Sequence, residues 1–143
     1  MQAAARTLGV ELKLVSASEV AGIDDGITTF VRQHIDALFV SGDGFFLTHS
    51  DQIVALAARH AIAATYGRRE AVMLGGLMSY GTDFFDAWRQ AGVYAGRVLN
   101  GERTSAPVQQ VTRLELFINL KTANVLGVNV PIPLLGRADD MLE

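Results

Sequence analysis

Cysteine is absent from this 143-residue chain, and charged residues and long apolar runs are scarce. Without cysteine the chain has no disulfides, no thiolate metal sites and no cysteine nucleophile. Only 19% of the residues are charged and the net charge is -3, so no stripe of Lys and Arg can neutralise nucleic-acid phosphates. No apolar run reaches membrane-spanning length. Half of the residues are hydrophobic, which predicts a folded chain with a sizeable core.

Segments with strand character alternate with segments of helical periodicity. The strands are expected at residues 12–15, 37–40, 61–66, 77–80 and 114–118. Helix caps are expected at Asp24, at the pair Thr48 and Asp51, and at Asp83. This order predicts an α/β fold, a mostly parallel sheet flanked by helices in three flavodoxin-like or Rossmann-like layers.

Helix ends and connections have their own signals. Gly9 and Gly127 are expected to end helices in the left-handed conformation. Residues 104–111 are expected to form a polar connector, and residues 139–143 an acidic turn. Because the chain starts inside a helical pattern at residues 1–9, with no capping residue before it, we expect a fragment of a longer protein.

Polar side chains follow the predicted parallel strands, and these ends share one edge of the sheet, where ligands bind in such folds. The candidate ligand-binding residues are Asp43, Tyr66, Tyr80, Ser79 and Ser41. Asp43 could pair with an ammonium group through a charge-assisted hydrogen bond. The two tyrosines could cover a ligand side chain or donate to a carboxylate, with the two serine hydroxyls beside them. The alternatives are an Asx turn at Asp43, ordinary packing of the tyrosines and simple turn hydroxyls.

Signals for catalysis and for bound cofactors are missing. No Gly-x-Ser-x-Gly elbow, Walker A loop or Gly-x-Gly-x-x-Gly fingerprint occurs. His49 and Asp51 are the only hint of a metal site, and they lack further ligands. We therefore expect a binding module without cofactor or metal, and not an enzyme. A signalling or enzymatic flavodoxin-like domain is the alternative, although the acidic pair of a phospho-acceptor domain is absent after the first strand.

Several ordered motifs resemble the ABC-transporter substrate-binding proteins of the tryptophan/tyrosine type. The motif Gly-Gly-Leu-Met-Ser-Tyr-Gly lies at residues 75–81, and Leu-Glu-Leu-Phe-Ile-Asn-Leu-Lys-Thr-Ala lies at residues 114–123. The other matching stretches are residues 53–60, 89–102, 126–127, 130–131 and 134–139. Together they cover nearly the whole chain. One departure is at residues 68–71, which lack a phenylalanine often found in the family.

The resemblance implies a truncated lobe of the type I periplasmic-binding-protein fold. Residues 1–82 would be a second-lobe-like ligand-binding unit, and residues 83–143 a helix-strand-helix segment that returns to the first lobe. It also implies an amino-acid-like ligand in an interlobe cleft, closure at a hinge, an ABC permease as partner and a periplasmic location. No export signal is visible at residues 1–9, so the form given could be cytoplasmic.

An incomplete fold predicts self-association. Without a first lobe, the apolar side of the helix at residues 83–100 and the strand at residues 114–118 would be exposed, and such patches drive association. We therefore expect a homo-oligomer. A non-catalytic oligomerisation module that has lost ligand binding is the other reading of the truncated chain.

Overall fold

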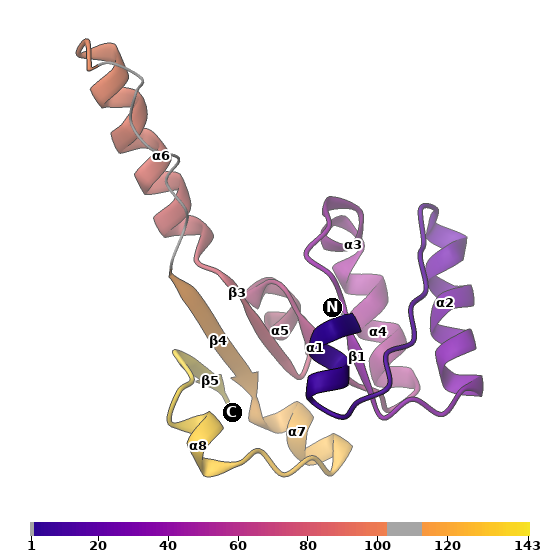
Figure 1. Ribbon diagram of the computed structural model, residues 1–143. Coiled ribbons are helices and arrows are strands. Elements are labelled where there is room, and N and C mark those ends of the chain that lie inside the picture. Colours follow the sequence, from indigo (N-terminus) through magenta and orange to yellow (C-terminus); the bar gives the residue numbers. More distant parts are fainter. Residues whose placement is uncertain (1, 103–112) are drawn as a thin grey trace. The chain divides into compact units, whose positions relative to one another are not determined.

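The computed structural model of the chain describes residues 2–102 and 113–143 (Figure 1). It contains two compact units, Met1–Ile35 and Asp36–Glu143. The polar connector expected at residues 104–111 lies outside the described residues. The expected division after residue 82 concerns the lobes of the family and stays a prediction.

The first unit consists of two helices, α1 (Gln2–Thr7) and α2 (Val20–Arg32). Gly9 has φ +67°, which confirms the left-handed residue predicted after α1. The strand predicted at residues 12–15 is wrong: a strand needs a hydrogen-bonded neighbour, and the described residues of this unit contain no other extended segment. The predicted cap at Asp24 is also wrong, because α2 begins one turn earlier, after Glu19.

The second unit is built on a five-stranded sheet (Figure 1). Its strands are β1 (Ala37–Phe39), β2 (Ala63–Tyr66), β3 (Met78–Thr82), β4 (Leu114–Asn119) and β5 (Asp140–Leu142). They lie in this order across the sheet, and every neighbouring pair is parallel except β3 and β4. The predicted mostly parallel α/β sheet is therefore confirmed.

The C-terminal strand replaces the predicted acidic turn. The backbone N–H of Asp139 donates to the Leu116 carbonyl at 2.9 Å, and the Asp139 carboxylate accepts from the Leu116 N–H at 2.8 Å. These two bonds fix the chain beside β4, so that residues 140–142 continue as a parallel strand. The acidic composition of this segment was therefore a misleading signal, because Asp139, although exposed, satisfies a backbone N–H of β4.

In the described part of the second unit, six helices accompany the sheet. They are α3 (Gly44–Thr48), α4 (Ser50–Arg59), α5 (Arg69–Met73), α6 (Phe84–Leu99), α7 (Leu120–Leu126) and α8 (Ile132–Leu135). The predicted cap at Asp83 and helix end at Gly127 are confirmed. The predicted cap at Thr48 is wrong: its hydroxyl donates to the Gly44 carbonyl at 2.8 Å, and α4 begins after His49.

The core of the second unit lies between the sheet and α5. This short helix contacts α4 and the strands β2, β3 and β4. Val72 of α5 and Ile118 of β4 are 0% and 1% exposed. By contrast, α6 has no buried residue. No helix in the described ranges is long and apolar enough to cross a membrane.

Candidate functional site

A pocket of about 300 Å³, counting its open mouth, lies where β2 and β3 end. The segment after β2, the last residues of β3, the first turn of α6 and one face of β4 surround it. The lining residues are Gly67, Arg68, Arg69, Glu70, Ser79, Gly81, Thr82, Phe84, Phe85, Glu115 and Phe117. The carboxyl ends of parallel strands are where open α/β sheets bind ligands, so we take this pocket as the candidate site.

The pairing of β3 with β4 explains which strand side chains reach the pocket. Ser79 lies opposite Phe117, and Gly81 lies opposite Glu115. Because side chains alternate between the two faces of a sheet, these four residues share one face. Ser79 is only 2% exposed, yet it lines the pocket. Among the described residues we find no hydrogen-bond partner for its hydroxyl.

Two arginines stack on the aromatic rings of this pocket. The guanidinium carbon of Arg68 lies 4.2 Å from the centre of the Phe84 ring. That of Arg69 lies 4.6 Å from the centre of the Phe85 ring and 5.7 Å from that of Phe117. These distances are within the range of cation–π attraction. The rings thus position two cationic groups at the pocket wall.

The two arginines differ in their ion pairing. Arg68 donates through Nη2 and Nε to the two carboxylate oxygens of Glu70, at 2.9 and 3.1 Å. These hydrogen bonds lower the pKa of Glu70. Among the described residues, no carboxylate lies within ion-pair distance of Arg69. The guanidinium of Arg68 is therefore engaged in an ion pair, whereas that of Arg69 is not hydrogen-bonded to a carboxylate of the described residues.

Backbone forms much of the remaining wall. A Cβ atom placed on Gly81 would overlap the carbonyl oxygen of Gly67, and one on Gly67 would lie 3.1 Å from the Cα of Gly42. Backbone therefore meets backbone here: Gly42 follows β1, Gly67 follows β2, and Gly81 lies near the end of β3. A side chain at Gly81 would force the backbone of Gly67 away, and one at Gly67 would require a smaller shift.

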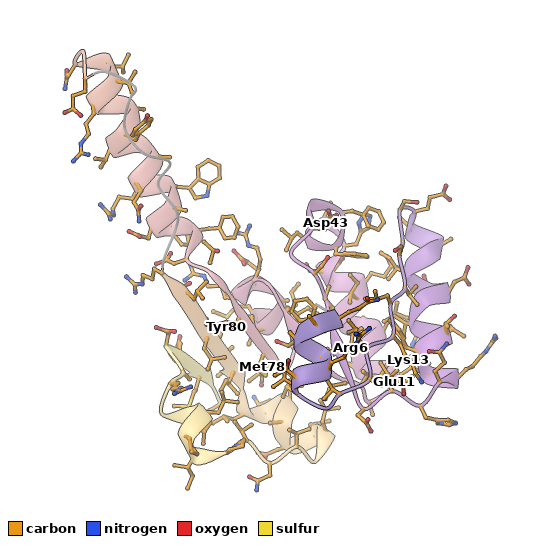
Figure 2. All side chains as sticks on the ribbon, viewed as in Figure 1. Arg6, Glu11, Lys13, Asp43, Met78 and Tyr80 are labelled. Carbon is orange, nitrogen blue, oxygen red and sulfur yellow. The ribbon has the colours of Figure 1, made fainter. Side chains whose placement is uncertain are left out.

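The residues predicted from the sequence are distributed differently. Ser79 lines the pocket, and the others do not. Asp43 is exposed and caps α3, its Oδ1 accepting from the Phe45 N–H at 2.9 Å, and Figure 2 shows it at the start of that helix. Ser41 is exposed. The ligand roles proposed for these residues stay predictions.

The two tyrosines occupy opposite environments. Tyr66 is 3% exposed, and burial raises its pKa to about 12. Its ring lies against Gly76, where an added Cβ would come within 2.6 Å of the ring. Tyr80 is 55% exposed and follows Ser79 on β3 (Figure 2), so it projects from the other face of the sheet. Its two neighbours in the sequence, Ser79 and Gly81, both line the pocket.

Sequence reasoning missed the cationic and aromatic residues of the pocket. Arg68 and Arg69 follow β2 directly, and the same edge-of-sheet argument that selected Tyr66 covers them. Phe84 and Phe85 have the spacing of helix packing residues, which hides a role in a binding site. Their position in the first turn of α6, directly after β3, was the available signal.

Metal ligands are not grouped in the described part of the chain. No three His, Asp or Glu side chains there lie close enough to hold a metal ion. The chemistry of the described pocket is therefore that of guanidinium, carboxylate, hydroxyl and aromatic groups.

Solved structures with the same fold support the assignment of an α/β lobe. A conserved domain protein from Vibrio cholerae matches with TM-score 0.88 and 21% identity, over 98% of this chain and 47% of its own. An ABC domain from Streptococcus pneumoniae in complex with L-Trp matches with TM-score 0.88 and 23% identity, over 98% and 49%. The ligand-free, open structure of a substrate binding protein with adhesive properties from Clostridium difficile gives 0.68 and 20%, over 99% and 47%.

The chain thus spans about half the length of the solved proteins that it matches. No curated protein matches it. The family model of the ABC transporter substrate binding protein matches residues 1–142, which is almost the whole chain. The chain belongs to the family of ABC transporter substrate-binding proteins.

Proposed function

We propose that this chain supplies one wall of the binding site for a small, amino-acid-like solute. The ligand would lie in the pocket at the ends of β2 and β3, within a cleft between two lobes, as the family resemblance suggests. The solute would then pass to an ABC permease, and the protein would work in the periplasm. The carrying observation is the pocket itself, where Ser79, two guanidinium groups and two phenyl rings of α6 meet.

The chemistry of the pocket suits a ligand that is apolar at one end and charged at the other. Phenyl rings offer a surface for a flat side chain. Guanidinium groups bind carboxylates through paired hydrogen bonds. The bound L-Trp of the structural relative from Streptococcus pneumoniae has both features and supports this ligand class.

Ligand titration of the full chain tests this function. We expect one or more amino acids, with L-Trp as the first candidate, to raise the melting temperature and to give a calorimetric binding signal. Ser79→Ala should weaken that binding by roughly tenfold, the value of about one hydrogen bond. If no amino acid shifts the melting temperature at millimolar concentration, the proposed function is wrong.

Asp43 remains a proposed anchor for the ammonium group of the ligand, and its capping role allows a clean test. Asn caps helices about as well as Asp, so Asp43→Asn keeps the bond to Phe45 and removes only the charge. If the carboxylate binds an ammonium, this variant should lose affinity at unchanged stability. Asp43→Ala should lose stability as well, by about 1 kcal/mol. Unchanged affinity in Asp43→Asn would assign the residue to capping alone.

A second candidate function is self-association through α6. The apolar side chains Phe85, Trp88 and Leu99 of this helix are 68%, 73% and 86% exposed, and exposed groups of this kind support association. We expect light scattering coupled to size exclusion to give a dimer or larger species. Trp88→Gln should shift the mass toward that of the monomer. A monodisperse monomer of the unmodified chain would exclude this function.

A further inference from the structure

We propose that Arg69 is the anchor for the carboxylate of the ligand, with the Ser79 hydroxyl as its companion donor. The pocket would then discriminate amino acids from their amides and from amines. This inference rests on the proposed function and adds which end of the ligand enters and which groups hold it.

Arg69, unlike Arg68, has no hydrogen-bonded carboxylate among the described residues, although its charge also contributes to lowering the pKa of Glu70. The guanidinium of Arg68 is engaged with both oxygens of Glu70, and a ligand carboxylate would have to displace that bidentate pair. Arg69 has no such partner in the described ranges 2–102 and 113–143. An incoming carboxylate can therefore bind Arg69 without breaking an existing ion pair.

Stacking prepares Arg69 for this task. Its guanidinium lies over the rings of Phe85 and Phe117 at 4.6 and 5.7 Å. Stacking occupies the flat faces of the guanidinium, while the N–H donors lie at its rim. A guanidinium held in one plane loses little further conformational freedom when it binds a planar carboxylate. The rings thus leave the rim donors for the ligand.

Ser79 supplies a second donor at the same level of the sheet. It lies opposite Phe117, whose ring is one of the two under Arg69. The residue is 2% exposed and lines the pocket, and no buried side-chain oxygen or nitrogen of the described residues lacks a partner. Its hydroxyl is therefore accessible from the pocket, where it can donate to a ligand oxygen.

The acidic residues of the pocket do not oppose this assignment. Glu70 is neutralised by Arg68. Glu115 lies opposite Gly81, two residues along the strand pair from Ser79 and Phe117, which is roughly 7 Å. The carboxylate of Glu115 therefore does not occupy the place beside Phe117 where an anion would meet Arg69. The pocket has a cationic part beside Phe117 and an acidic part beside Gly81.

Paired ligands test the inference on the full chain. L-tryptophan and L-tryptophanamide differ only in the carboxylate, and isothermal titration calorimetry measures both. We expect the unmodified chain to bind the amide at least tenfold more weakly than the acid. Arg69→Gln should weaken binding of L-tryptophan by roughly 10- to 100-fold and change binding of the amide little. The discrimination should therefore collapse.

Two further variants control the experiment. Arg89→Gln removes the same charge from an exposed position on α6 outside the pocket, and it should preserve the discrimination. Arg69→Lys keeps the charge but not the paired donors, so it should give an intermediate loss, and it replaces Arg69→Gln if that variant does not fold. The assignment of Arg69 would be overturned if the unmodified chain bound acid and amide equally well. It would also be overturned if both Arg69 variants still discriminated between the two ligands. If no amino acid binds at all, the proposed function is wrong, and this inference is wrong with it.

Discussion

Glycine at the strand ends of the second unit is required by backbone contact and not by turn geometry. Gly81 approaches the carbonyl of Gly67 so closely that no Cβ fits between them, and Gly67 has a looser contact with Gly42, at 3.1 Å from an added Cβ. None of the three is among the glycines with positive φ. The small size of Gly81, and to a lesser degree that of Gly67, thus sets the spacing of the pocket wall, whereas an added Cβ at Gly42 would meet no atom within 4 Å.

Replacing Gly81 should therefore be costly. Gly81→Ala should lower the free energy of unfolding by about 3 kcal/mol, because a Cβ at this position meets backbone atoms that cannot rotate away. Urea denaturation measures the change. Gly92→Ala on α6 is the matched control: no atom lies within 4 Å of its added Cβ, so it should leave stability unchanged or increase it by up to about 1 kcal/mol. A Gly81→Ala protein as stable as the parent would contradict the close contact.

Tyr66 should give the protein a distinct alkaline transition. Burial raises its pKa to about 12, whereas an unfolded tyrosine ionises near pH 10. Between these values the unfolded state binds fewer protons, so the free energy of unfolding falls as pH rises from about 10 to about 12. The loss should total on the order of 2 kcal/mol, and the contribution is present in full below pH 10.

The matched variant for this transition is Tyr66→Phe. It should flatten the decrease between pH 10 and 12 and remove the latest phase of the tyrosinate absorbance titration. Denaturation curves at several pH values give the first quantity, and ultraviolet absorbance gives the second. An identical pH slope in parent and variant would mean that Tyr66 is not held neutral by burial.

At the scale of elements, Asp83 joins β3, α6 and β4. Its side chain is 9% exposed and caps α6, accepting from the Asp86 N–H at 3.0 Å. The same carboxylate lies 3.3 Å from Nε of Arg113, and its backbone N–H donates to the Arg113 carbonyl. One residue thus fixes the point where the chain leaves the sheet against the point where it returns.

Variants of Asp83 should separate its two roles. Asp83→Asn keeps the capping acceptor and loses the ion pair, so we expect a loss of about 1 kcal/mol in the free energy of unfolding. Asp83→Ala removes both and leaves buried donors unsatisfied, so the loss should be about 2–3 kcal/mol. Thermal denaturation followed by circular dichroism would test this order. If the two variants were equally stable, the cap would contribute nothing.

Elements with local signals were predictable from the sequence. Asp83 caps α6 and Gly127 ends α7 because each acts within one helical turn. The start of α4 was misplaced because Asp43 begins a separate short helix first, which ties up Thr48. The strand predicted at residues 12–15 and the unpredicted β5 failed for a common reason. Whether an extended segment becomes a strand depends on a distant backbone partner, which the local pattern does not contain.

The pocket was only partly predictable for a similar reason. Ser79 was found because it ends a strand in a recognisable motif. Arg69 was not, since its significance depends on Phe85 and Phe117, which come from two other elements. The alternation of β3 also separates Ser79 from Tyr80, although they are adjacent in the sequence. The residue types in the sequence predict which edge of the sheet holds the pocket. Which residues line the pocket depends on how the strands pair.

At the scale of the whole molecule, the two compact units differ in how their backbones are satisfied. The first unit contains two helices and, in its described part, no strand. The second unit has β2, β3 and β4 paired on both sides. Helices of modest length derive little stability from their own hydrogen bonds, so the units should open with different free energies.

Native-state hydrogen exchange would measure this difference. We expect the amides of α2 to exchange with a lower opening free energy than those of β3 and β4, because the central strands can open only when the sheet does. The amides of α5 serve as an internal reference, since this helix packs on the same strands. Equal protection of α2 and β4 would mean that the chain opens as one cooperative unit.

The alternation along β3 has a consequence for how this protein can change over evolutionary time. A substitution at Ser79 alters one contact. Loss or gain of a single residue in the strand instead moves every following side chain to the opposite face of the sheet. Tyr80 would then occupy the place opposite Phe117, and the hydroxyl of Ser79 would move to the other face. The segment should therefore drift in residue type while its length stays fixed, so that new ligand preferences arise here by replacement and not by insertion.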